Sequence, residues 1–131
     1  AAGLGDSRIV AAIPMAGSYR ANWFGESGWQ AVTGALLVLS GSLDGPTGMQ
    51  AQWDAMDPRP MTWVELVGGC HETFGLNLCD SLDPEVSQPL VEVYSLAFAR
   101  AALLGDTAAQ TVGILDGTVI LNADVVRLES R

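Results

Sequence analysis

The chain has 131 residues, a net charge of −9 and 49% hydrophobic residues, so it can form one domain or part of one. Its six basic residues, all arginines, stand against fifteen acidic ones and form no basic stripe, which argues against nucleic-acid binding. The longest apolar runs are interrupted well before about 18 residues, so we expect no membrane span. The small, polar start of the chain also lacks the features of a signal peptide.

The first half of the chain predicts two buried strands followed by a helix. The continuous apolar run from Arg8 to Ala16 predicts a strand buried on both faces, as in a parallel sheet. A second such strand spans Ala35 to Ser40 and ends in a loop, Gly41-Ser42-Leu43-Asp44-Gly45-Pro46, set by its glycines and proline. Apolar residues at helical spacing then predict a helix from Thr47 to Met56.

The second half predicts a third strand and a long helix. The strand, Met61 to Val67, leads into Gly68-Gly69-Cys70-His71, which contains the only histidine of the chain. Asp83 is a good N-cap, Pro84 suits the first helical position, and Gly105 is the expected stop of the helix between them. The apolar runs in the tail, 107–131, fit either a short helix and a strand or a terminal hairpin.

This alternation of strands and helices predicts a single α/β unit with parallel strands and flanking helices. In such sheets the chemistry gathers beyond the carboxyl ends of the strands. Asp44 and His71 both follow such ends on consecutive strands, about 5 Å apart in a parallel sheet, so their side chains should meet. Asp54, Asp57 and Glu72 are weaker alternatives for the acidic partner, because two lie on or after the helix and Glu72 is adjacent to the histidine.

Two cysteines, Cys70 and Cys79, flank the histidine. They can form a disulfide in an oxidising compartment, which would favour a secreted or periplasmic protein, or remain two buried free thiols. Two cysteines and one histidine are too few for a structural zinc site, which needs four ligands, so we expect no metal. We expect no cofactor either.

The order and spacing of these motifs resemble the C-terminal half of an α/β-hydrolase, closest to the dienelactone hydrolase, chlorophyllase and platelet-activating-factor acetylhydrolase-like group. The resemblance rests on Gly41-Ser42-Leu43-Asp44 after one strand and Gly68-Gly69-Cys70-His71-Glu72-Thr73-Phe74 after the next, 27 residues apart from acid to histidine. It covers roughly residues 1–106, and the helix from Pro84 to Gly105 is similar to the closing helix of the group. The resemblance implies that Asp44 and His71 are the acid and the base of a Ser-Asp-His triad.

The chain departs from that family in one respect: it contains no Gly-x-Ser-x-Gly nucleophile elbow. We therefore expect an acyl or carboxylic-ester hydrolase subunit or fragment whose serine lies on a complementary half or partner chain. The alternatives are a non-catalytic binding or assembly module and a domain-swapped homo-oligomer. The strand from Arg8 to Ala16 should have lost its neighbour and would be an exposed apolar edge, so we expect the chain not to be a stable monomer alone.

Overall fold

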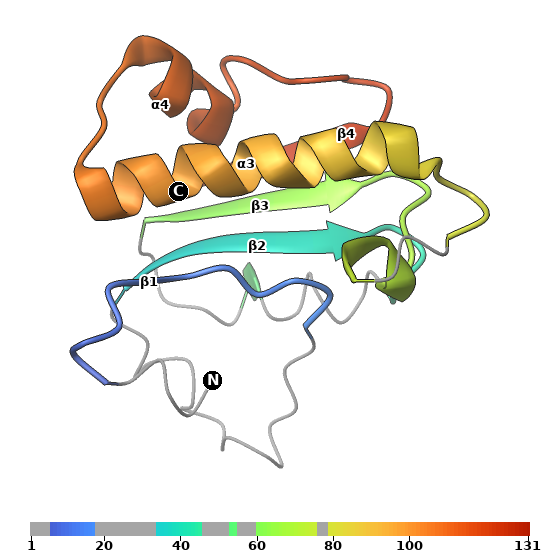
Figure 1. Cartoon of the computed structure of the whole chain (residues 1–131), viewed down its shortest axis with the longest axis horizontal. Coiled ribbons are helices and arrows are strands. Elements are labelled where there is room, and N and C mark those ends of the chain that lie inside the picture. The colour runs from blue at the N-terminus through green and yellow to red at the C-terminus, as the bar shows by residue number, and fades with distance from the viewer. Residues whose placement is uncertain (1–5, 18–33, 46–52, 55–59, 76–78) are drawn as a thin grey trace.

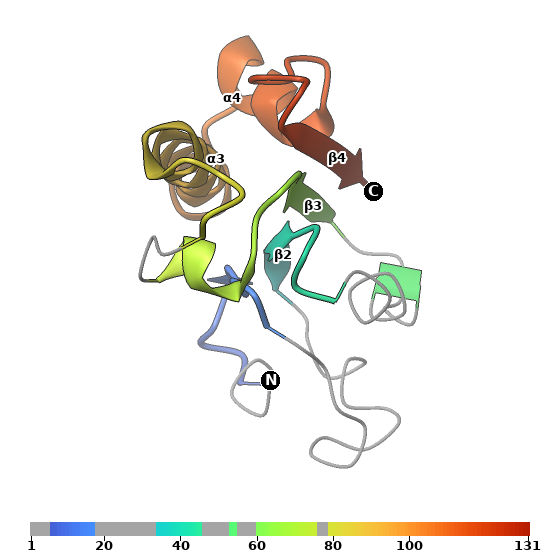
Figure 2. The same ribbon diagram turned by 90° about the vertical axis from the view of Figure 1, so that its right-hand side faces the viewer.

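The computed structural model describes residues 6–17, 34–45, 53–54, 60–75 and 79–131, and shows an α/β fold. Four strands form one mixed sheet in the order β1-β2-β3-β4, with β1, β2 and β3 parallel and β4 antiparallel to β3. Two helices, α3 and α4, pack together on one face of this sheet (Figures 1 and 2). The expected fold class is therefore confirmed, although the sheet is small and its last strand reverses direction.

The two central strands are those that the sequence marks most clearly. β2 (Ala35–Gly41) and β3 (Met61–Leu66) are adjacent and in register from Leu36 opposite Met61 to Gly41 opposite Leu66. Their apolar side chains alternate between the two faces, and both faces are buried. This double burial explains why both strands read as continuous apolar runs.

The first strand differs from expectation. Only Ala11–Ala12 form β1, which pairs with β2, and a single further bridge joins Met15 to Leu39. Val10 and Met15 are 58% and 39% exposed, so the prediction of a strand buried on both faces is wrong. Among the described residues no strand lies on the outer side of β1. Ala11 and Ala12 are partly buried, each packed against one of the two hydrophobic clusters of the sheet.

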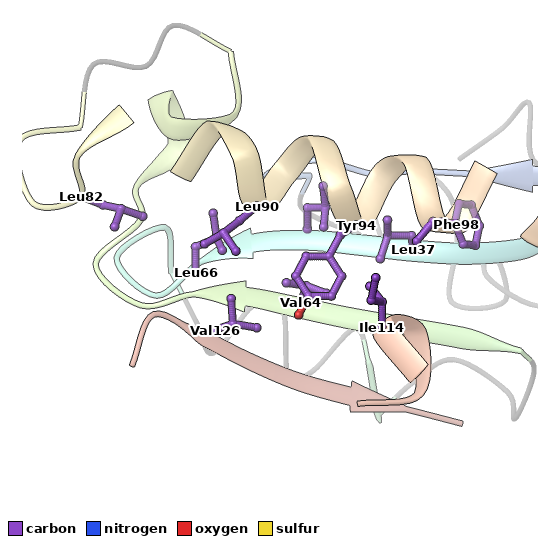
Figure 3. Close-up of a cluster of buried hydrophobic side chains, with 11 residues drawn as sticks. Leu37, Val64, Leu66, Leu82, Leu90, Tyr94, Phe98, Ile114 and Val126 are labelled. Atoms are coloured by element: carbon purple, nitrogen blue, oxygen red, sulfur yellow. The ribbon is translucent and has the colours of Figure 1, made fainter. Parts of the chain in front are cut away.

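The larger hydrophobic core lies between the sheet and the helices (Figure 3). α3 (Pro84–Leu104) contributes Leu90, Tyr94 and Phe98, which pack on the inward side chains of β2 and β3. A smaller cluster covers the opposite face, where Trp53 stacks at a tilt on Trp63. Trp53 and Asp54 are helical, and the rest of the helix predicted for Thr47–Met56 lies outside the described residues.

The long helix begins and ends as the sequence predicts. The Asp83 carboxylate accepts a hydrogen bond from the Glu85 amide (2.8 Å), Pro84 occupies the first turn, and Gly105 takes the left-handed conformation. The tail resolves into α4 (Ala109–Asp116) and β4 (Val126–Ser130), which settles the open choice in favour of a helix and a strand. In the part of the chain described here, no helix has the length and apolarity needed to cross a membrane.

Candidate functional site

Asp44 and His71 meet at the carboxyl edge of the sheet, where β2 and β3 both end. The Oδ2 atom of Asp44 lies 3.1 Å from Nδ1 of His71, across 27 positions of sequence. The Asp44 side chain is largely shielded, at 23% exposure, whereas the imidazole is 67% exposed. The structure thus brings together the two side chains that the sequence singles out.

Two glycines allow the loops that carry these side chains to pack backbone against backbone. A Cβ atom on Gly41 would lie 2.9 Å or less from the main chain of Gly69 and Cys70, a distance that real Cβ atoms do not show. Gly68 has a φ of +83°, a conformation that favours glycine, and there the chain turns out of β3. The Gly-Gly sequence before the histidine therefore has a steric origin in the approach of the two loops.

Three hydrogen bonds hold the same loops together. The amide of Leu43 donates to the carbonyl of Gly69 (2.8 Å), and the amide of Ser42 donates to the carbonyl of Leu66 (3.0 Å). In the opposite direction, the Gly68 amide donates to the Ser42 hydroxyl (2.9 Å). Because two of the three bonds join main chain to main chain, the separation of Asp44 from His71 depends mainly on the backbone.

The histidine is the first residue of η2 (His71–Phe74), a short 3-10 helix. The Cys70 amide donates to the Thr73 hydroxyl (3.0 Å), which caps this turn, and Phe74 packs against the larger core. A disulfide joins Cys70 to Cys79 with the Cα atoms 5.8 Å apart, within the usual range. Of the two states left open by the sequence, the disulfide is the one present, and it ties the residue before His71 to the segment that leads into α3.

A further contact holds this loop from the other side. The Ser81 hydroxyl donates to the carbonyl of Gly68 (2.7 Å), at the residue that turns the chain out of β3. Sequence reasoning did not identify Ser42 or Ser81 as supports of the site. Each is one serine in a polar loop, and nothing in the spacing distinguishes it from an ordinary turn residue.

The contact between Asp44 and His71 fixes what the ring can do. An ionised carboxylate only accepts hydrogen bonds, so Nδ1 must carry the proton in this contact. In the neutral ring the lone pair is then on Nε2, which lies on the opposite side of the imidazole from Asp44. Nε2 has no hydrogen-bond partner among the described residues, and the exposed ring can reach a group from outside.

The other acidic residues that the sequence offered do not make this contact. Asp54 lies in the short helical segment on the opposite face from α3, and Glu72 follows the histidine without a hydrogen bond to its ring. Asp57 lies outside the described residues. The described residues also contain no group of three or more His, Cys, Asp or Glu side chains placed to hold a metal ion.

The site contains a carboxylate and a histidine in contact and, in the part of the chain described, no nucleophile beside them. The ring of His71 makes no hydrogen bond with a described serine, threonine or cysteine side chain. The nearby hydroxyls of Ser42 and Ser81 are occupied with Gly68. Comparisons with known proteins add no assignment: no protein-family model and no curated protein matches this chain.

Proposed function

We propose that Asp44 and His71 are the acid and the base of a Ser-Asp-His triad in an acyl or carboxylic-ester hydrolase, and that the serine is supplied by a segment or chain beyond these 131 residues. The observation that carries the proposal is the 3.1 Å contact between Asp44 Oδ2 and His71 Nδ1, on a ring that is mostly exposed. In such a triad the acid binds the Nδ1–H group and so directs the basic Nε2 atom toward the serine.

The chemistry follows from this arrangement. His71 Nε2 takes the serine proton as the serine oxygen attacks the ester carbonyl, and an acyl-enzyme and an alcohol result. Asp44 keeps the ring in the required tautomer and stabilises the imidazolium that forms. Water then repeats the sequence on the acyl-enzyme and releases the acid, with His71 again moving the proton.

The edge of the sheet at β1 supports a complementary half. Val10 and Met15 are apolar and exposed there, and in the described part of the chain the outer side of β1 has no neighbouring strand. Exposed edge strands are normally covered, because their free backbone groups and apolar side chains pair with other chains. A strand added at this edge would run close to the site, because the bridge between Met15 and Leu39 lies near the carboxyl end of β2.

The test uses the native assembly, purified through a tag on this chain. We expect the assembly to hydrolyse a short-chain p-nitrophenyl ester and a fluorophosphonate to label a polypeptide segment other than residues 1–131. The His71→Ala variant should lose roughly three or more powers of ten in kcat, and Asp44→Asn should lose about two to four. Asp124→Asn, an exposed change of the same kind, is the matched control and should keep full activity.

Two further results separate catalysis from a structural role. Added imidazole should partly restore hydrolysis to the His71→Ala assembly, which a merely structural histidine would not allow. An assembly that is neither labelled nor active, or one that stays active without His71, overturns the proposal. An assembly that is neither labelled nor active would favour the alternative of a non-catalytic binding or assembly module.

A further inference from the structure

The second free edge of the sheet lies at β4, on the opposite side from β1 (Figure 2). In the described part of the chain nothing pairs with the outer side of this strand, whose sequence is Val126-Arg127-Leu128-Glu129-Ser130. It contains no proline, and its two charges have opposite signs. Edge strands are usually protected by prolines, bulges or charges that repel a second strand. Neither a proline nor a pair of like charges protects β4 in this way.

The ladder between β3 and β4 shows which backbone groups of β4 point outward. Met61 and Arg131 exchange two backbone hydrogen bonds (2.9 and 3.0 Å), so they form a hydrogen-bonded pair. Because such pairs alternate along an antiparallel ladder, the odd-numbered residues of β4 direct their N–H and C=O groups to β3. The even-numbered residues Val126, Leu128 and Ser130 direct theirs to the outer edge.

One of these outward groups already has a partner, and the central ones do not. The Val126 amide donates to the carbonyl of Asn122 (2.9 Å), which closes the start of the strand. The N–H and C=O groups of Leu128 make no hydrogen bond within the described residues, and neither does the N–H group of Ser130. These are the groups that a further strand would use.

We propose that this edge is a homodimer interface, in which β4 pairs antiparallel with β4 of a second copy about a two-fold axis at Leu128. In this register Leu128 faces Leu128, and Val126, whose amide already bonds Asn122, faces Ser130 of the other copy. The Leu128 residues of the two copies then form a hydrogen-bonded pair, which uses their outward N–H and C=O groups. The Ser130 amide of each copy can donate to the carbonyl of Val126 in the other.

The same register makes the charges complementary. Arg127 lies opposite Glu129 of the second copy, and the two-fold axis repeats this pair. These positions form the non-hydrogen-bonded pairs, in which side chains approach most closely. If positions 127 and 129 had charges of the same sign, they would repel each other across the two-fold axis. Their opposite charges therefore favour a second copy of this strand as the partner.

Arg127 has the capacity for this additional partner. Its Nη1 atom donates to Oε2 of Glu65 (2.9 Å), a carboxylate on β3 that is almost fully buried. The Arg127 side chain is itself mostly exposed, and a guanidinium has five donors in a planar fork. It can therefore bridge Glu65 and Glu129 of the second copy. The interface does not depend on the proposed hydrolase function, which uses the other edge.

The experiment measures the mass of the protein in solution by sedimentation velocity over a range of concentrations. The unaltered chain should reach twice its 13.7 kDa mass. In a homodimer of the Glu129→Arg variant, or of the Arg127→Glu variant, both symmetry-related pairs of positions 127 and 129 carry like charges. Each variant should therefore raise the Kd of the dimer roughly tenfold. An equimolar mixture of the two variants restores both opposite-charge pairs and should form a heterodimer. Glu92→Arg, the same charge change at an exposed position of α3, is the control and should dimerise normally.

Circular dichroism verifies that each variant is folded. If Arg127→Glu does not fold without its bond to Glu65, Ser130→Pro replaces it, because proline removes an outward N–H group and leaves the ladder to β3 intact. This variant should also be monomeric at concentrations where the unaltered chain is a dimer. A monomer at all concentrations, or a dimer that Glu129→Arg does not weaken, overturns the inference.

Discussion

Gly41 lies so close to Gly69 that a Cβ atom on the former would stand 2.3 Å from the carbonyl oxygen of the latter. This contact between two main chains sets the distance between the loop that carries Asp44 and the loop that carries His71. Hydrogen bonds from Leu43 to Gly69 and from Gly68 to Ser42 keep the loops at that distance. The site can therefore be disturbed at a residue that takes no part in its chemistry.

Gly41→Ala should push the two loops apart. The new methyl group meets backbone, which cannot rotate away, so we expect a loss of about 1–3 kcal/mol in the free energy of unfolding. Denaturant unfolding measures the loss, and NMR of the single histidine shows whether its ring has changed environment. Gly75→Ala is the control, because a Cβ atom there meets nothing within 4 Å, and it should behave like the unaltered protein.

Asp44→Ala should change the tautomer of His71. The carboxylate holds the proton on Nδ1 of the neutral ring, and without it the ring is free to carry the proton on Nε2. Nitrogen-15 NMR distinguishes the two forms, and the single histidine makes the assignment direct. The Asp124→Ala variant should retain the Nδ1–H form. A ring already protonated on Nε2 in the unaltered protein would contradict the contact with Asp44.

Reduction of the Cys70–Cys79 disulfide should destabilise the protein and loosen the histidine loop. The bond closes a loop across nine positions, for which the chain-entropy estimate is about 2–3 kcal/mol. Unfolding with and without a reducing agent measures this difference. In a Cys70→Ser/Cys79→Ser variant the reducing agent should have no effect. Equal stability of the oxidised and reduced forms would show that the bond adds nothing to the fold.

Asp106 should contribute to the pH dependence of stability. Its hydrogen bonds with the Ala108 amide (2.9 Å), with Arg100 (2.7 Å) and with Thr111 (3.0 Å) hold the pKa of its carboxyl below the ordinary value. Because the pKa is lower in the folded state, the contribution is complete above the unfolded value of about 3.9. It is lost as the pH falls through the folded value.

The Asp106→Asn variant tests this dependence. It should be less stable than the unaltered protein near pH 6 and should lose less further stability on acidification below about pH 4. Thermal unfolding at a series of pH values gives both curves. The exposed Asp124→Asn change should leave the curve unaltered. Parallel curves for Asp106→Asn and the unaltered protein would show that this carboxylate is not linked to folding.

The parts of the fold that the sequence predicts correctly are those with local signals. The runs that form β2 and β3 are buried on both faces, and α3 has its Asp83 cap, its Pro84 and its Gly105 stop. The meeting of Asp44 with His71 was predictable because parallel neighbouring strands end at one edge. The triad role of the pair stays a prediction, because it requires a serine and His71 makes no hydrogen bond with a described serine side chain.

Other features depend on neighbours that the sequence does not specify. The run from Arg8 to Ala16 has the composition of an inner strand, but burial on both faces requires packing layers on both sides of the sheet, and Val10 and Met15 remain exposed. The direction of β4 depends on how α4 returns the chain to the sheet, which the apolar runs alone do not encode. The pairing of Cys70 with Cys79 likewise depends on the loop geometry around Gly68 and not on the spacing alone.

Main-chain contacts largely set the position of the imidazole, so exposed side chains beside it that make no contact between the two loops can vary. Leu43 is 60% exposed and Glu72 is also exposed, and neither side chain supports the approach of the two loops. Substitutions at Leu43 and Glu72 could therefore reshape the surroundings of the ring while the ring keeps its position.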